Sequence, residues 1–210
     1  MRKKQVVMVL IAIIAFSFLG AAWLANEYQR RQAAMGGKIA IIYVEGVIIG
    51  GRGQTGLLNQ SGGTDNLIKQ LRRAKNDAAV KAVVLRINSP GGSAAASQEV
   101  GEELQKLRAA GKIVVTSMGD IATSGGYWLA ASTDKIYANP STITGSIGVY
   151  MTYTNLEELY EKIGIYQEKI KSGPHKDILA PERSMTADER AIIQGMVDDI
   201  YNQFLDVVAT

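Results

Sequence analysis

The 210-residue chain contains no cysteine and a single histidine, His175. Without thiols it can form no disulfide bond, no cysteine-based catalytic centre and no thiolate metal site. A single imidazole also excludes zinc sites that are built from several histidines. We therefore expect neither a metal nor another cofactor, and a nucleophilic mechanism would need a side chain other than cysteine.

The excess of positive charge is confined to the N-terminus. The chain has a net charge of +3, but its first 31 residues carry five basic groups against the single acidic group of Glu27, which is +4. The remaining 179 residues therefore carry −1. This leaves no cationic surface for a polyanion, so we expect no nucleic-acid partner.

A long uncharged run lies next to these basic residues. It extends over 20 residues from Val6 to Ala25, after Arg2, Lys3 and Lys4. At a rise of about 1.5 Å per residue such a helix spans the hydrocarbon core of a bilayer, which is about 30 Å thick. A cleaved signal peptide is the alternative, but its apolar region is usually only about 7–15 residues long.

We therefore predict that residues 1–25 form a cytoplasmic tip and a single transmembrane anchor in contact with membrane lipid. The positive charges favour a cytoplasmic N-terminus, which would leave residues 38–210 as an extracytoplasmic domain. The polar residues 26–37 are predicted to be a stalk between the two.

Strand and helix patterns alternate after residue 38, which predicts an α/β domain with a largely parallel sheet covered by helices. A glycine-rich loop is expected over Gly50–Gly63 and an irregular segment over Lys171–Arg183. The predicted strands are 39–44, 47–49, 80–87, 113–115, 135–138 and 165–170. Helices are predicted over 94–110, 127–131 and 155–164. Two further helices are predicted from their caps: one is capped by Thr64 and Asp65, and the last begins at a capping box over 186–189.

One serine occupies the corner of a predicted strand–turn–helix. Ser124 follows the apolar strand that begins at Ile113 and precedes Gly125, Gly126 and an apolar helix from Tyr127. A rigid corner would project its hydroxyl, and the amide of Gly125 would lie in the first helical turn without an intrahelical partner. The alternative is a glycine-rich turn in which the serine only caps the helix.

A second glycine turn has the same architecture. The buried strand 80–87 runs into Ser89-Pro90-Gly91-Gly92, and a helix follows. If the two strands are parallel neighbours, Gly92 and Gly125 lie side by side with two amides converging on one point. An acyl-transfer enzyme needs such donors where charge develops on a carbonyl oxygen. An ordinary strand-to-helix turn remains the alternative.

A serine nucleophile also needs a base. His175 could act with Asp120, Asp134 or Asp177, and the residues do not forbid this. The other candidate is Lys176, which needs burial in an apolar pocket to lower its pKa from about 10.4. From the residues alone, both bases stay open.

Four motifs occur in order: Ser-Pro-Gly-Gly at 89–92, Thr-Ser-Gly-Gly-Tyr at 123–127, Thr-Gly-Ser-Ile-Gly-Val at 144–149 and Lys-Ser-Gly-Pro-His-Lys-Asp at 171–177. Together they resemble the bacterial signal peptide peptidase family of the protease IV type, in its short, single-anchor form. The resemblance implies a Clp/crotonase-like fold of repeated strand-strand-helix units. It also implies a serine endopeptidase that degrades remnant signal peptides and assembles into homo-oligomers.

The resemblance further implies a role for five residues. Ser124 would be the nucleophile and Lys176 the general base, with Ser146 orienting the lysine. Gly92 and Gly125 would supply the oxyanion amides. Members of this family usually continue beyond the position of Thr210, so the domain over 38–210 is expected to lack its C-terminal part.

Two other classes remain as alternatives. A crotonase-type enzyme acting on an acyl-CoA would use the paired glycine-turn amides but would not need Ser124 or Lys176. A catalytically inactive membrane scaffold is the third reading. A membrane anchor argues against the acyl-CoA enzyme, and labelling of Ser124 by a serine-reactive probe would separate all three.

Overall fold

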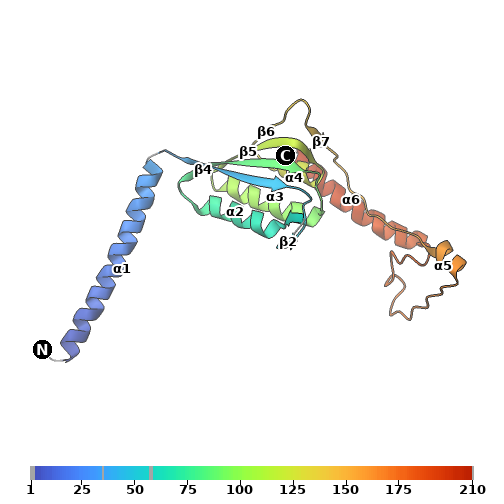
Figure 1. Cartoon of the computed structure of the whole chain (residues 1–210), viewed down its shortest axis with the longest axis horizontal. Helices are drawn as coiled ribbons and strands as arrows, with labels where there is room; N and C mark the ends of the chain where they lie inside the picture. The colour runs from blue at the N-terminus through green and yellow to red at the C-terminus, as the bar shows by residue number, and fades with distance from the viewer. Residues whose placement is uncertain (1–2, 35, 57–58, 210) are drawn as a thin grey trace. The chain divides into compact units, whose positions relative to one another are not determined.

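The computed structural model of the chain describes residues 3–34, 36–56 and 59–209, which form two compact units, 1–144 and 145–210. Helix α1 covers Lys3–Ala34 (Figure 1) and contains the segment Leu10–Tyr28, which is long and apolar enough to cross a membrane, with a mean hydropathy of 1.7. The predicted stalk is therefore largely helical, because its Ala, Gln, Glu and Arg residues are good helix formers. Arg2, part of the predicted basic cluster, lies outside the described residues.

A mainly parallel sheet forms the centre of the first unit. Its strands β1 (Lys38–Glu45), β4 (Val80–Ser89), β5 (Ile113–Thr123) and β6 (Lys135–Tyr137) are hydrogen-bonded in that order, each pair parallel. The short strand β7 (Ile143–Gly145) also pairs with β5. The prediction of a parallel α/β sheet is therefore confirmed, and β4 and β5 are neighbours as the two glycine turns require.

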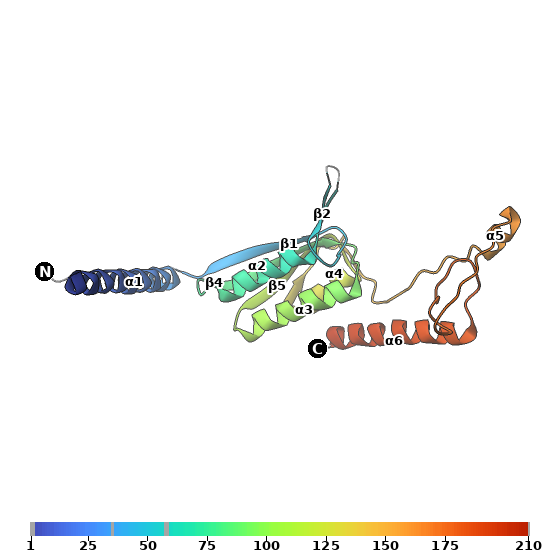
Figure 2. The same cartoon turned by 90° about the horizontal axis from the view of Figure 1, so that it is seen from below.

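Helices α2 (Thr64–Asn76), α3 (Ala94–Ala109) and α4 (Gly125–Ala131) lie on one face of this sheet (Figure 2). Strand side chains alternate between the two faces. On β4 the side chains of Val83, Leu85 and Ile87 are completely buried under the helices. The other face of edge strand β1 exposes its large apolar side chains, among them Ile41 and Tyr43.

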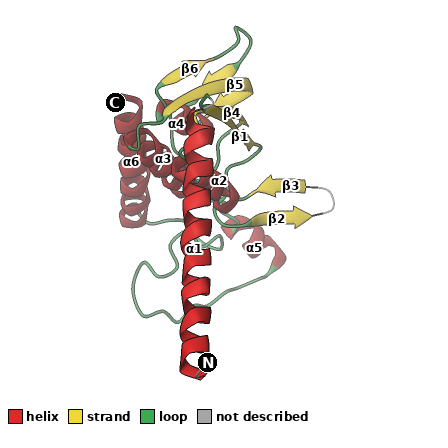
Figure 3. Cartoon of the chain, turned by 90° about the vertical axis from the view of Figure 1, so that its left-hand side faces the viewer, coloured by secondary structure: helices red, strands yellow, loops and turns green. Residues whose placement is uncertain are grey.

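The segment Gly50–Gly63, predicted to be a loop, contains a hairpin of strands β2 (Gly53–Gly56) and β3 (Asn59–Gly62) (Figure 3). The two strands pair antiparallel through their backbones and consist of glycine and polar residues, so side-chain patterns did not reveal them. The predicted strand 47–49 is reduced to one bridge between Ile48 and Gly92. The predicted cap is also wrong: Gly63 caps α2, and the buried hydroxyl of Thr64 has no hydrogen-bond partner.

The second unit contains helices α5 (Glu157–Ile163) and α6 (Ala187–Ala209). Helix α5 ends at Gly164, whose φ of 69° is the left-handed conformation typical of a C-terminal cap. The strand predicted over 165–170 is wrong, because this exposed segment is irregular and pairs with no strand. The segment 171–183 is irregular, as predicted.

The capping box at the start of α6 is confirmed. The amide of Thr186 donates to Glu189 Oε2 at 3.0 Å, and the amide of Glu189 donates to Thr186 Oγ1 at 3.2 Å. This reciprocal pair satisfies two amides that an uncapped helix would leave without partners.

Candidate active site

Ser124 lies at the corner between β5, which ends at Thr123, and α4, which begins at Gly125. Its backbone has φ 51° and ψ −122°, an unfavourable conformation for a residue with a side chain. Such a conformation costs about 1–3 kcal/mol and persists only where the surroundings impose it. The half-buried side chain makes no capping hydrogen bond to α4, so the helix-cap interpretation of this serine is wrong.

The glycine turn after β4 packs directly against this corner. A Cβ atom added to Gly91 would lie 2.7 Å from the amide nitrogen of Gly125 and 2.8 Å from the Cβ of Ser124. A Cβ atom on Gly125 would lie 3.3 Å from the amide nitrogen of Gly92. The structure thus brings Gly92 and Gly125 together beside Ser124, and only glycine at position 91 permits this approach.

Hydroxyl groups hold the two turns in place. Ser89 Oγ donates to the carbonyl of Gly46 at 2.6 Å and accepts from the amide of Gly91 at 3.1 Å. Thr123 Oγ1 donates to the carbonyl of Pro90 at 3.0 Å. Since Ser89 is fully buried, these bonds form in a setting where an unpaired polar group would be costly.

Asn88 links the ends of the same two strands. Its Oδ1 accepts from the amides of Asp120 at 3.1 Å and Ile121 at 3.2 Å, where the register between β4 and β5 shifts. Thr144 Oγ1 donates to the carbonyl of Ala122 at 2.9 Å. The backbone that leads into Ser124 is therefore fixed by side chains from both neighbouring strands.

Lys176 and Ser146 belong to the second unit, whereas Ser124, Gly92 and Gly125 belong to the first. The side chains of Lys176 and Ser146 are both exposed. Ser146 has a φ of 56°, the second of three described non-glycine residues with positive φ. The structure therefore brings Ser124, Gly92 and Gly125 together, and the residues around Lys176 within 145–210 leave its side chain exposed.

His175 has no aspartate partner in the second unit. Its side chain is 42% exposed, and Nδ1 lies 3.9 Å from Oε1 of Glu189. The carboxylate of Asp177 is bound by basic side chains, and that of Asp134 by Arg108. Two of the three aspartates proposed for a serine–histidine site thus already have other partners.

The sequence model of a protein family described as "Peptidase family S49" matches residues 106–210, which is half of the chain. A relative from Methanocaldococcus jannaschii is 33% identical over 214 residues, a match that covers the whole of this chain and 68% of the relative. The chain belongs to peptidase family S49. The matched range of this S49 chain includes Ser124, Gly125, Ser146 and Lys176.

Other relatives are much longer. Protease 4 of Salmonella typhi is 39% identical over 177 residues, covering 84% of this chain and 28% of the relative. The chloroplastic serine protease SPPA of Arabidopsis thaliana is 37% identical over 173 residues, covering 82% of this chain and 25% of the relative. The chain spans between about a quarter and just over half of the length of the first relatives it matches.

A second model, for Clp protease, matches residues 57–145. This range contains both glycine turns and Ser124, and it confirms the predicted Clp-like α/β fold of the S49 chain. A solved membrane protease specific for a stomatin homolog, from Pyrococcus horikoshii, superposes with a TM-score of 0.39 at 18% identity, over 51% of this chain and 48% of its own.

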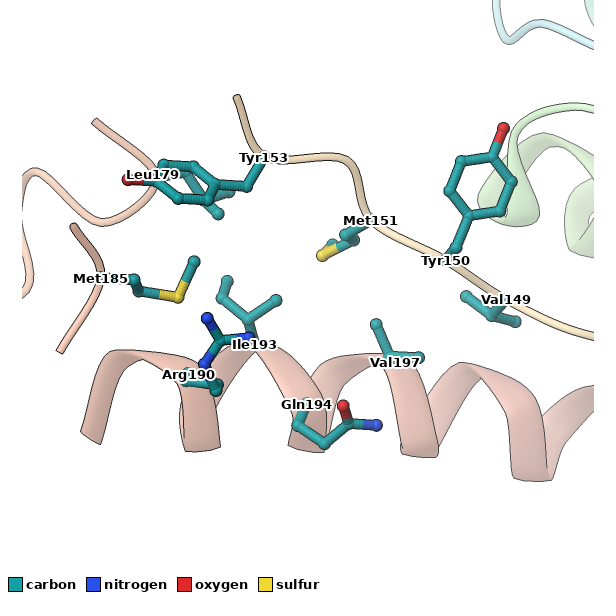
Figure 4. A pocket seen from close by; sticks show the side chains of 10 residues that line it. All are labelled: Val149, Tyr150, Met151, Tyr153, Leu179, Met185, Arg190, Ile193, Gln194 and Val197. Carbon is teal, nitrogen blue, oxygen red and sulfur yellow. The ribbon is translucent and has the colours of Figure 1, made fainter. Parts of the chain in front are cut away.

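The second unit of the S49 chain also contains a pocket of about 550 Å³, lined by apolar and aromatic side chains together with Arg190 and Gln194 (Figure 4). It lies between the extended segment around Met151 and helix α6, from which Ile193 and Val197 face it, with Arg190 beside them.

Several residues that shape the corner were not predicted. Asn88, Gly91 and Thr123 contact the turn or its strand, but none is itself of a type that points to catalysis. The only signal for Gly91 is its position before Gly92 in a strand-to-helix turn. The bonds from Asn88 cross 32 and 33 positions of sequence, so they follow only from the pairing of β4 with β5.

Proposed function

We propose that the chain is a membrane-anchored serine endopeptidase in which Ser124 is the nucleophile and Lys176 the general base. The observation that carries this proposal is the strained backbone of Ser124 against the Gly91–Gly92 turn, in a chain of family S49. A strained corner of this kind exposes a serine hydroxyl next to backbone amides, as acyl transfer requires.

Each residue has one chemical task in this proposal. Lys176 takes the proton of the Ser124 hydroxyl while the oxygen attacks the scissile carbonyl, and the resulting oxyanion accepts hydrogen bonds from the amides of Gly92 and Gly125. Collapse breaks the peptide bond, and the leaving amine takes the proton from Lys176. Lys176 then takes a proton from a water molecule as its oxygen attacks the acyl carbon, and it returns this proton to the Ser124 oxygen as the ester bond breaks. Ser146 orients the lysine amine throughout.

A lysine base must be neutral, and this requires desolvation. Since Lys176 is exposed within its own unit, its desolvation has to come from outside residues 145–210. We propose that assembly into a homo-oligomer supplies it. The exposed apolar face of β1, which carries Ile39, Ile41 and Tyr43, supports a surface that is buried on association.

The proposed substrates are peptides, in particular the remnants of signal peptides. Helix α1 would anchor the chain in the bilayer with its N-terminus in the cytoplasm and place residues 38–210 on the other side. The apolar and aromatic side chains that line part of the pocket beside α6 are compatible with substrates that carry apolar side chains, which dominate the central region of a signal peptide.

The deciding experiment is covalent labelling with a fluorophosphonate probe. We expect the full-length chain in detergent to be labelled at Ser124, as identified by mass spectrometry, and a Ser124→Ala variant to be unlabelled. Absence of labelling in the folded chain would refute the peptidase. Turnover of an acyl-CoA without labelling would instead support the crotonase-type alternative.

A further inference from the structure

The segment that contains Lys176 has almost no regular structure of its own. Its backbone bonds are local turns, such as Ile178 N to His175 O at 3.2 Å and Ala180 N to Asp177 O at 3.0 Å. Leu179 adopts a φ of 65°, which is strained for a leucine. Something other than secondary structure therefore has to hold residues 175–180 in place.

Arg183 holds this segment through hydrogen bonds from both edges of its guanidinium. One edge binds the residue after Lys176: Nε donates to Asp177 Oδ2 at 3.0 Å, and Nη2 donates to Asp177 Oδ1 at 2.9 Å. The other edge binds helix α6: Nη1 donates to Glu189 Oε2 at 2.8 Å, and Nη2 donates to Glu189 Oε1 at 2.5 Å. Two bidentate contacts fix the guanidinium in position and in angle.

Glu189 is the buried residue to which Arg183 is bound. Its side chain is 1% exposed, and it also closes the capping box with Thr186 at the start of α6. The hydrogen bonds from Arg183, followed by the one from the Thr186 amide, lower the pKa of Glu189 to about 2. Arg183 likewise holds the pKa of Asp177 well below its usual range, with Lys171 second. Both carboxylates are therefore charged whenever the enzyme works.

We propose that Arg183 is a positioning residue for the general base: it ties the backbone at Asp177 to α6 and so fixes where the Lys176 amine is presented. The inference rests on the proposed function of Lys176. Displacement of a catalytic group by about 1 Å can cost about 10²-fold in rate, so a base on an otherwise irregular segment needs such a tie. A lysine at position 183 would keep the charge but could not bind two carboxylates in the same planar geometry.

The test compares Arg183→Lys with Lys169→Gln in the full-length chain. Lys169 makes an ion pair with Glu182 in the irregular stretch between α5 and α6. It does not contact Asp177 or Glu189, which makes it a matched control. With an apolar fluorogenic peptide, we expect Arg183→Lys to lower kcat by about 10²-fold with KM changed less than about twofold, and Lys169→Gln to leave both unchanged. In Arg183→Ala, added guanidinium should restore activity and added ammonium should not.

The outcomes separate the inference from the proposed function. If the wild-type chain shows no hydrolysis that depends on Lys176, both are refuted. Wild-type kcat in a folded Arg183→Lys chain, with hydrolysis still dependent on Lys176, refutes only the role of Arg183. If circular dichroism shows that the Arg183 variants are unfolded, the Asp177→Asn variant is measured instead. A lowered kcat in a folded Asp177→Asn chain supports the inference. Wild-type kcat, or unfolding of this variant, overturns it.

Discussion

Ser124 and Lys176 differ in how much of their surroundings the single chain provides. The serine is half-buried, has a strained backbone and lies between two glycine turns, and all of these residues belong to 1–144. The lysine is exposed, and its segment is held mainly by the charges of Asp177, Arg183 and Glu189. At the scale of residues, the single chain encloses the proposed nucleophile, whereas the proposed base needs a further surface to bury it.

The two candidate bases can be separated by single substitutions. We expect Lys176→Met to abolish peptidase activity, because no other amine would accept the serine proton, and His175→Ala to retain most of it. The measurement is kcat/KM on a peptide substrate together with circular dichroism. The reverse pattern would establish a serine–histidine site.

Ser146 is expected to act through Lys176. A neutral amine in an apolar pocket still has hydrogens that need acceptors, and a hydroxyl can accept one without adding charge. We expect Ser146→Ala to stay folded and to lose about 10²-fold in turnover. Ser146→Asp should be worse at neutral pH and recover partly as pH rises, since a carboxylate stabilises the ammonium form. Wild-type turnover in a folded Ser146→Ala chain would remove this residue from the site.

At the scale of elements, helices α2 and α3 are joined by a buried carboxylate. Glu103 is 5% exposed and accepts from Arg72 Nη2 at 2.9 Å and from Lys106 Nζ at 3.0 Å. The hydrogen bond from Arg72 is the largest cause that lowers the pKa of Glu103, to about 2. The two helices that cover the sheet are thus held together by charge as well as by apolar packing.

Replacing this carboxylate should weaken the first unit in a pH-dependent way. Because the folded pKa of Glu103 lies below its ordinary value of 4.5, its contribution is complete above about pH 4.5 and is lost as pH falls towards 2. We expect Glu103→Gln to lower the free energy of unfolding by about 1–2 kcal/mol at neutral pH, a modest value because Arg72 is largely exposed.

Urea titrations at about pH 7 and about pH 3 measure this difference, which should shrink at the lower pH. The exposed neighbour Glu102, substituted to Gln, is the control and should show no such change. An equal destabilisation at both pH values would contradict a contribution from the charge of Glu103.

At the scale of the whole molecule, the described residues contain one helix that is apolar and long enough to cross a membrane, and it lies at the N-terminal end of the first compact unit. Three basic residues lie before Val6, whereas Arg30 and Arg31 follow the apolar run, so the excess of positive charge is on the N-terminal side. Positive charge next to a membrane span favours the cytoplasmic side, which would place residues 38–210 outside the cytoplasm.

Protease added to intact spheroplasts tests this topology. We expect residues 38–210 to be digested from outside while a cytoplasmic marker protein stays intact. Protection of the domain in intact spheroplasts, with digestion only after lysis, would reverse the predicted orientation.

Features that depend on residues close together in the sequence, or on the periodicity of a strand, were predictable from the sequence. The buried strand over 80–87 and the capping box at Thr186 follow from local pattern. The adjacency of Gly92 and Gly125 follows from the same pattern only once their strands are parallel neighbours, because such strands end at one edge of the sheet. The same local logic misjudged 165–170, because an apolar run becomes a strand only where another strand is available to pair with it.

The enclosure of the corner at Ser124 follows from contacts between segments that are far apart in the chain. The positive φ of Ser124 and the contact with Gly91 arise where segments more than 30 residues apart meet, as do the bonds from Asn88 to the strand before the serine. Arg183 is closer in sequence to Asp177 and Glu189, but its two bidentate contacts require an irregular turn that no periodicity encodes. Strain and paired charges depend on the exact placement of several groups in space, and residue types along the chain do not specify that placement.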